Sequence, residues 1–179
     1  MVGALALAVR VIYAAVVTSG DRVVGDQVYY SAQAHMNAMG RWFVQPFTDG
    51  LPGADHPPLT VLALTPITFV VRHADFVAAQ RAFTVAVGVA DIVLLMAVAR
   101  RFVGPRAATV AGVLAAVHAA FWMGDTLILS EPYAVGALLL VLLAAHRLAE
   151  RADPRSAAWL GLAGGVVALA RSELVVLTP

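Results

Sequence analysis

Long apolar stretches alternate with short polar intervals along most of this chain. A helix that crosses a lipid bilayer needs about 20 mostly apolar residues, and six stretches approach that length. They are Val2–Ser19, Pro57–Val71, Phe76–Ala99, Ala107–Met123, Ser130–His146 and Ala157–Ala170, the last with an apolar continuation to Leu177. Because backbone in lipid must satisfy its own hydrogen bonds, we expect all six to be helices. The pattern predicts an all-α, polytopic transmembrane helical bundle of about six spans.

The longest polar interval, Gly20–His56, is the predicted extramembrane loop, and it carries Asp21, Asp26, Asp49 and Asp55. Within it, the segment 28–43 has helical periodicity, with one apolar arc formed by Val28, Ala32, Met36, Met39 and Phe43. Such a helix either lies flat at the membrane interface with this arc in the acyl boundary, or packs on the protein itself. Both alternatives hold Asp26 near the membrane surface.

Arginines cluster in two of the predicted connections, one with Arg100, Arg101 and Arg106 and the other with Arg147, Arg151 and Arg155. The positive-inside rule places both connections in the cytoplasm. If all six stretches cross the membrane, however, these connections lie on the same side as the Asp26 loop. Either the short second stretch does not fully cross, or the rule is overridden, and the sequence leaves both alternatives open.

Composition supports a membrane protein and excludes several other classes. Apolar residues make up 61% of the chain and charged residues 13%, whereas soluble domains are nearer half apolar and a quarter charged. Cysteine is absent, which excludes disulfides and thiolate metal sites. The net charge of +1 gives no reason to expect nucleic acid as a partner. No nucleotide-binding motif of the Walker or Rossmann type is present.

Asp26 and the pair Asp55-His56 are the candidate chemical groups of the polar loop. An Asp at a helix start is commonly an N-cap, because its carboxylate accepts backbone N–H groups. The functional alternative for Asp26 is a general base that takes a proton from an acceptor hydroxyl at the membrane surface. Asp55 and His56 could bind a hard metal or a phosphate, but two adjacent ligands favour a solvated turn over a metal site.

Two further polar groups interrupt the later apolar stretches. Ser130 can cap a helix whose first turn holds Glu131 and Pro132, and Glu131 is also a candidate functional carboxylate. Arg171 could hold a lipid phosphate by a charge-assisted hydrogen bond. Residues two apart on a helix point to different faces, so no ion pair between Arg171 and Glu173 is expected.

Ionisable residues also occur inside the predicted spans, where they are energetically expensive and indicate a functional or paired role. Arg81 and Asp91 lie in the third stretch, about 15 Å apart along a helix, so they cannot pair directly. We expect Asp91 to face the bundle, whereas Arg81 either extends toward the interface or steadies a lipid phosphate. Arg10 in the first stretch is a similar case.

The order of these features resembles the polyprenyl-phosphate-sugar-dependent glycosyltransferases of the GT-C superfamily. The nearest likeness is to the dolichyl-phosphate-mannose protein mannosyltransferase-like and aminoarabinose-transferase-like family. The residues that carry it are Gly25–Tyr30 leading to Ala38–Phe43, then His56–Leu59, Arg100–Gly104, Ser130–Pro132 and Leu169–Glu173. Each motif alone is weak, but their order spans nearly the whole chain.

The resemblance implies a multi-pass protein of a bacterial plasma membrane that moves a sugar from a polyprenyl-phosphate donor to a hydroxyl of a glycan, lipid or protein acceptor. Asp26 would be the catalytic carboxylate, although Gln27 stands where the family usually has Glu. Substrate contacts are expected from Tyr29, Tyr30, Asp55, His56, Glu131, Arg81 and Arg171. Metal dependence varies within the superfamily, so a divalent metal is left open and no other cofactor is expected.

Family members are typically longer, so residues 1–179 are expected to be the N-terminal part of a GT-C-type transmembrane domain and to be inactive alone. Two other functions are compatible with the sequence. A transporter segment would line a substrate path with Arg81 and Asp91, and it predicts broken helices in an inverted repeat. A non-catalytic membrane assembly protein would tolerate the loss of Asp26, Asp55 and His56 together.

Overall fold

The structure is a computed structural model and describes residues 1–18, 23–48, 50–71 and 75–177. Ser19, at the end of the first predicted span, and Asp21 and Asp49 of the polar loop lie outside the described residues. The described residues are helical apart from turns and one isolated antiparallel bridge between Val44 and Pro52, which confirms the all-α prediction. The elements are α1 (Val2–Val16), α2 (Asp26–Ala38), α3 (Pro58–Val70), α4 (Phe76–Val117), α5 (Ala119–Asp125), α6 (Glu131–Arg151), α7 (Pro154–Ala170) and the 3-10 helix η1 (Ser172–Leu177).

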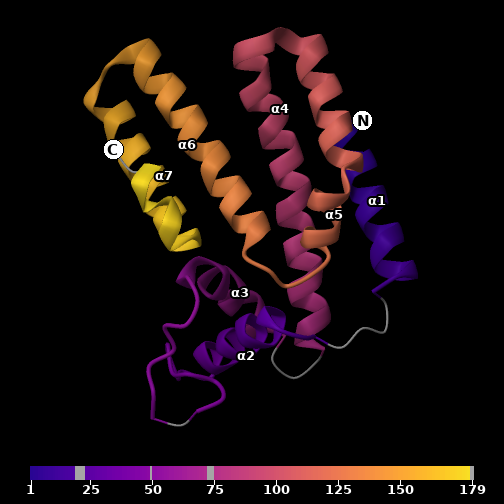
Figure 1. Cartoon of the computed structure of the whole chain (residues 1–179), viewed down its shortest axis with the longest axis vertical. Coiled ribbons are helices and arrows are strands. Elements are labelled where there is room, and N and C mark those ends of the chain that lie inside the picture. The colour runs from indigo at the N-terminus through magenta and orange to yellow at the C-terminus, as the bar shows by residue number, and fades with distance from the viewer. Residues whose placement is uncertain (19–22, 49, 72–74, 178–179) are drawn as a thin grey trace.

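α4 contains the third predicted stretch and most of the fourth as two limbs that meet at Gly104. Gly104 has φ 76° and ψ 171°, outside the helical region, and it precedes Pro105, which has no N–H to donate. Helix therefore continues through Arg100 and Arg101, which were predicted to lie in a loop. The chain reverses tightly at Gly104, so the two limbs run in opposite directions (Figure 1).

The lengthwise part of the molecule consists of α1, both limbs of α4, α5, α6 and α7, while α2 and α3 lie together at the lower end (Figure 1). α1 packs on α4, α4 on α6, and α6 on α7. The turn at Gly104 and the connection between α6 and α7 lie at the upper end. The two ends of the bundle therefore differ in structure, with a layer of two helices at one end and tight turns at the other.

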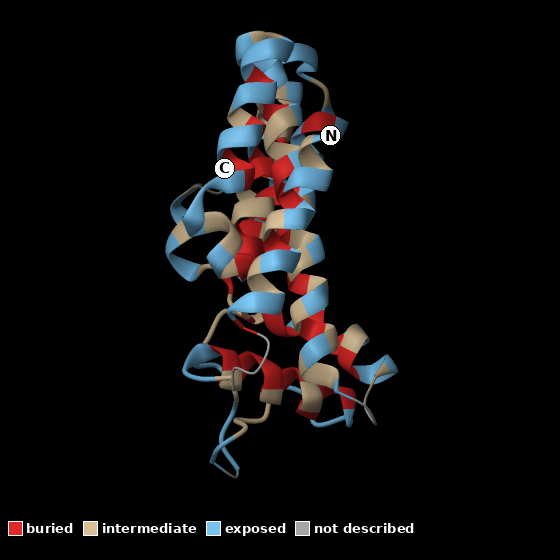
Figure 2. Cartoon of the chain, turned by 90° about the vertical axis from the view of Figure 1, so that its right-hand side faces the viewer, coloured by how far each residue is buried: buried red, intermediate tan, exposed pale blue. Residues whose placement is uncertain are grey.

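Within the described residues, two helices, α4 and α6, are long and apolar enough by length and composition to cross a membrane, and α1 and α3 are shorter apolar helices. The predicted count of about six spans is therefore not confirmed. Large apolar side chains such as Val93, Leu140 and Leu162 remain exposed on the outer faces of the lengthwise helices, at 53%, 45% and 61% of their area. Figure 2 shows exposed residues alternating with buried ones along these helices. An apolar outer face is suited to lipid rather than to water.

The position of α3 removes the conflict with the positive-inside rule. α3 forms where the second apolar stretch predicts a helix, but it lies beside α2 at the lower end instead of running lengthwise (Figure 1). Its 13 residues span about 20 Å, which is less than the roughly 30 Å of a bilayer's hydrocarbon core. The loop with Asp26 and the two arginine-bearing turns consequently lie at opposite ends of the bundle.

α2 is shorter than the predicted interfacial helix, and it buries a different face. It begins at Asp26 and ends at Ala38, and Gly40, two residues further on, has a positive φ of 85° that ends the helical path. Phe43, which was predicted to lie on the helix, also has a positive φ, of 52°. Of the predicted apolar arc, Met36 is buried, whereas Met39 is 54% exposed beyond the helix end. The residues of α2 that pack in the core shared with α3 and α6 are Tyr29, Tyr30 and Ala34. The structure thus agrees with a helix packed on the protein, but through its aromatic side.

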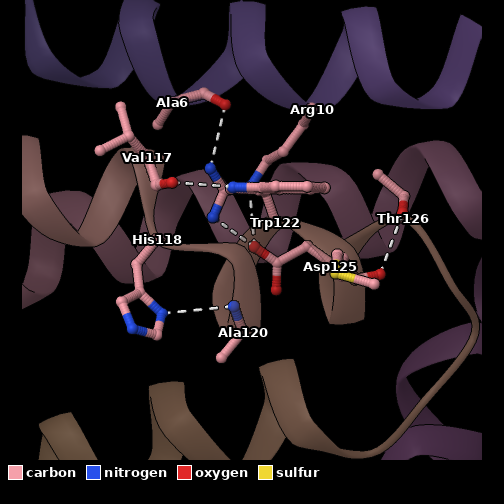
Figure 3. Close-up of polar contacts among 9 residues, drawn as sticks. Ala6, Arg10, Val117, His118, Ala120, Trp122, Asp125 and Thr126 are labelled. Atoms are coloured by element: carbon pink, nitrogen blue, oxygen red, sulfur yellow. Dashed lines mark hydrogen bonds and ion pairs between the residues drawn. The ribbon is translucent and has the colours of Figure 1, made fainter. Parts of the chain in front are cut away.

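A buried ion pair joins α1 to α5 inside the bundle (Figure 3). Arg10 Nε donates to Asp125 Oδ2 at 2.7 Å, and Arg10 Nη1 donates to the carbonyl oxygen of Ala6 at 3.0 Å. Arg10 and Asp125 are 0% and 3% exposed. Asp91 of α4 is buried nearby, which confirms that it faces the bundle.

Candidate active site

The candidate site lies at the lower end of the bundle, where four separate parts of the chain meet. These are the start of α2, the segment before α3, the start of α6, and the residues that follow α7. All of the predicted site residues except Arg81 belong to them. These parts come together because α3 does not run along the bundle (Figure 1). If α3 ran lengthwise, the chain would change direction once more, and the starts of α2 and α6 would lie at opposite ends of the bundle.

Asp26 is the first residue of α2, and the N-cap position belongs to Gly25, which has φ 56°. Asp26 therefore does not have the capping position that is the usual structural role of Asp at a helix start. Its Oδ1 lies 4.0 Å from Nε2 of His56, and its side chain is 62% exposed. An exposed carboxylate beside an imidazole can accept a proton from a hydroxyl that enters from solvent.

His56 is held against two tyrosines of α2. Its ring centroid lies 4.5 Å from that of Tyr29 and 5.2 Å from that of Tyr30, in tilted arrangements. Pro57 and Pro58 follow His56, and their fixed φ gives an extended approach and then a helix start, with Pro58 at the first turn of α3. The prolines and the aromatic contacts together orient the imidazole toward Asp26.

Tyr29 and Tyr30 stay protonated in this setting. Burial raises the pKa of the Tyr29 phenol, and the charge of Asp55 raises it further. Burial also raises the pKa of Tyr30, with smaller contributions in the same direction from Asp26 and Glu131 that the Ser130 hydroxyl and Arg171 oppose. A phenol with a raised pKa is a hydrogen-bond donor at neutral pH, not a base. The two tyrosines are therefore not bases; they are buried, at 5% and 2% of their area, and pack against His56.

Arg171 connects α6 to the residues after α7. Its Nη2 lies 2.8 Å from Oε1 of Glu131, and its Nη1 lies 3.2 Å from Oε1 of Glu173. The prediction that Arg171 and Glu173 do not pair was wrong, because it assumed a continuous helix. Arg171 is extended, with φ −150° and ψ 121°, and the chain then enters the 3-10 helix η1.

The prediction that the Ser130 side chain caps α6 was wrong. It occupies the N-cap position of α6, but its side chain makes no capping hydrogen bond. Its hydroxyl instead lies next to that of Tyr30. Pro132 in the first turn of α6 needs no N–H partner, so α6 starts without a side-chain cap. The adjacency of Ser130 and Glu131 in sequence was the available signal for its presence at the site.

Arg81 and Asp91 lie outside the four parts that meet at the candidate site. Arg81 donates from Nη1 to the carbonyl oxygen of Thr18 at 3.2 Å, and it lines a cavity of about 1080 Å³ between α1 and α4. Asp91 is buried against Gly136 of α6, where any Cβ would meet its carboxylate. The cavity that Arg81 lines does not include Asp91 among its lining residues.

A cavity of about 510 Å³ opens beside Asp55 and His56, and its wall includes Phe43 and Ser172. The cavity brings the polar loop next to the residues after α7. Among the residues that the structure describes, no three His, Cys, Asp or Glu side chains are grouped closely enough to hold a metal ion. The divalent metal left open by the sequence therefore has no preformed cluster of protein ligands in the described part of the chain.

The sequence profile for the dolichyl-phosphate-mannose-protein mannosyltransferase family matches residues 55–179, well over half of the chain. The chain belongs to this family. The match agrees with the resemblance noted in the motifs and makes the protein a member of a membrane glycosyltransferase family. No curated protein and no solved structure matches the chain.

The family match covers part of the candidate site. His56, Glu131 and Arg171 lie within the matched residues, while Asp26, Tyr29 and Tyr30 precede them. The family assignment therefore does not depend on the α2 residues. Their connection to the family segment is spatial, through the contacts of His56 with Asp26 and with both tyrosines.

Proposed function

We propose that this family member transfers a sugar from a polyprenyl-phosphate donor to an acceptor hydroxyl, with Asp26 as the catalytic carboxylate. The observation that carries the proposal is the convergence of Asp26, His56, Glu131 and Arg171 at one end of an apolar bundle. This end offers an exposed carboxylate to an aqueous acceptor, and apolar helix surfaces to a membrane-borne donor. Glycosyl transfer needs both substrates at one place.

In the proposed reaction, the acceptor oxygen attacks the anomeric carbon of the donor sugar and its proton passes to the Asp26 carboxylate. The bond between the anomeric carbon and the phosphate oxygen breaks, and the polyprenyl phosphate leaves with the electron pair. The configuration at the anomeric carbon is inverted. Tyr29 and Tyr30, as protonated phenols, would donate hydrogen bonds to sugar or acceptor oxygens, and Asp55 and His56 would complete the contacts.

Arg171 is the cation that we propose for the leaving phosphate, in preference to Arg81. It lies within the convergent site, whereas Arg81 donates to the carbonyl oxygen of Thr18, just after α1. Two carboxylates already flank its guanidinium, so a phosphate has to replace Glu131 or Glu173 as the partner. A guanidinium can bind a phosphate by two parallel hydrogen bonds, which compensates for the lost carboxylate contact.

Substitution of Asp26 by Asn tests the proposal, because Asn keeps the shape of the side chain and removes the base. Transfer of a radiolabelled sugar from its polyprenyl-phosphate donor is measured in membranes of cells that express the full-length gene. We expect a rate loss of about 100-fold or more, the range for a general base. Asp153→Asn is the matched control, because Asp153 caps α7 at the other end and Asn caps equally well. Normal transfer by Asp26→Asn would remove Asp26 from the mechanism.

We further propose that the site faces away from the cytoplasm. The arginine-bearing turns lie at the end opposite the site, and the positive-inside rule assigns such turns to the cytoplasm. The chain has no cysteine, so Ala54→Cys and Ala149→Cys report on the two ends separately. A membrane-impermeant maleimide added to intact cells should label position 54 and not position 149, and the reverse pattern would refute this orientation.

A further inference from the structure

Six arginines gather at the upper end of the bundle, far from the candidate site. All six are exposed, and they come from the turn at Gly104 and from the region where α6 passes into α7; this arginine end consists of Arg100, Arg101, Arg106, Arg147, Arg151 and Arg155. Two contacts join the turn of α4 to the end of α6. Arg101 Nη1 lies 3.8 Å from Glu150 Oε2, and the ring centroids of Phe102 and His146 are 5.3 Å apart. The arginines therefore form one surface.

Few negative charges compensate this surface. Glu150 is shared between Arg101 and His146, whose Nε2 lies 3.3 Å from its Oε1. Asp153 is the N-cap of α7, and its Oδ1 accepts a hydrogen bond from the backbone N–H of Ser156 at 2.8 Å. The hydrogen bonds from Ser156, with a smaller contribution from the charge of Arg147, lower the pKa of Asp153, so it remains ionised. Six guanidinium groups thus face two carboxylates, and the surface keeps a strong positive charge.

Apolar side chains lie among the arginines. Phe102 and Val103, at the turn of α4, are 63% and 58% exposed, and Trp159 on α7 is 57% exposed. Exposed aromatic residues next to arginines are typical of the boundary between headgroups and acyl chains, where one part of the surface meets water and the other meets lipid. If the arginines bound a soluble acidic protein instead, the exposed Phe102, Val103 and Trp159 side chains would have no role next to them.

We infer that the arginine end binds the headgroups of anionic phospholipids in the leaflet that it contacts. Guanidinium groups match phosphodiester oxygens in charge and in the geometry of paired N–H donors. The exposed apolar residues place these guanidinium groups at headgroup level instead of out in solution. The inference does not depend on glycosyl transfer, since it concerns the end of the bundle opposite the candidate site.

The test compares lipids around the purified full chain in nanodiscs, where both faces of the protein are accessible whatever its orientation in cells. Electron paramagnetic resonance measures how strongly spin-labelled phosphatidylglycerol and spin-labelled phosphatidylcholine associate with the protein. We expect phosphatidylglycerol to be preferred about fivefold or more, which corresponds to a single basic group near an anionic headgroup. The preference should fall as salt is added, because salt screens charges.

Variants locate the binding surface. The triple variant Arg101→Gln, Arg106→Gln and Arg151→Gln should lose most of the preference, while the corresponding lysine triple variant should retain much of it because the charge remains. Arg41→Gln, which lies beyond the end of α2 and far from the arginine end, is the control and should leave the preference for phosphatidylglycerol unchanged. If the glutamine variant does not fold, the salt titration of the unmodified chain still decides between charge-dependent binding and none.

Two results would overturn the inference. One is equal association of the two lipids with the unmodified chain at low salt, which would leave a soluble acidic partner as the alternative for this surface. The other is a preference for phosphatidylglycerol that persists in the glutamine triple variant, because the anionic lipid would then bind elsewhere.

Discussion

Arg10 Nε donates to Asp125 Oδ2 at 2.7 Å, so a guanidinium in the middle of α1 is paired with a carboxylate 115 positions later in the chain. The carboxylate of Asp125 packs directly against Gly88. Any side chain at position 88 would overlap this carboxylate, so only glycine leaves room for it. Asp125 ends α5, and the buried residues Thr126, Ile128 and Ser130 follow it toward the candidate site. The ion pair thus fixes the start of the loop between α5 and α6, which positions Ser130 and Glu131 at the candidate site.

Loss of one member of this pair should destabilise the protein more than loss of both. Arg10→Met leaves the Asp125 carboxylate buried without its partner, and we expect the free energy of unfolding to fall by about 3–5 kcal/mol. The double variant Arg10→Met with Asp125→Leu should be less destabilised than Arg10→Met. Unfolding in mixed micelles by increasing denaturing detergent measures both. Additive losses in the double variant would show that the two side chains do not interact.

The anchoring of the loop can be tested separately from stability, because the chain lacks cysteine. Ser130 is 7% exposed and Ser156 is 0% exposed, so Ser130→Cys and Ser156→Cys should react slowly with a maleimide in detergent. Addition of Arg10→Met should speed labelling at position 130 and not at position 156, because position 156 lies at the other end of the bundle. Equal acceleration at both positions would indicate general loosening and refute a specific effect on the loop.

Gly88 should not tolerate even a methyl group. In Gly88→Ala the new Cβ would overlap the Asp125 carboxylate, and the neighbouring helices have to move apart at a cost of about 1–3 kcal/mol. Gly165→Ala, on an exposed part of α7 where a Cβ meets nothing within 4 Å, is the matched control. That control should be neutral or stabilising by about 0.5–1 kcal/mol, since Ala favours helix over Gly. The same detergent titration compares the two, and equal stability of both variants would contradict the close packing at Gly88.

The raised pKa of Tyr30 predicts how stability depends on pH above neutrality. The folded state favours the protonated phenol, so this contribution is complete below the ordinary tyrosine pKa of 10.0 and is lost as pH rises through the higher pKa of the folded protein. Tyr30→Phe cannot ionise, and its stability should therefore decline less between pH 10 and more alkaline conditions. Unfolding measured across this range, for the variant and the unmodified chain, checks the sign. A steeper decline in Tyr30→Phe would refute it.

Much of the helical architecture follows from local sequence properties. The apolar stretches predict α1, α3, α6 and α7 to within a few residues at most of their ends, because helix formation in an apolar setting is decided by hydropathy and by breakers close in sequence. The small residues Ala157, Gly161 and Gly165 show where such local reasoning stops. Their spacing of four is typical of close helix packing, yet Gly161 and Gly165 are exposed and have no neighbour near a Cβ. Which face of a helix is covered depends on its neighbours.

The sequence by itself determined that this is an all-helical chain with one acidic, aromatic loop, and its motifs were sufficient to indicate the glycosyltransferase family. Only the tertiary structure decided that α3 lies beside α2, which brings Asp26, His56, Glu131 and Arg171 to one end and the arginines to the other. Hydropathy cannot distinguish a short helix that crosses the bilayer from one that packs at its edge, because both need apolar residues. Contacts between distant segments make that choice, as they do for Arg10 and Asp125, and no local pattern encodes them.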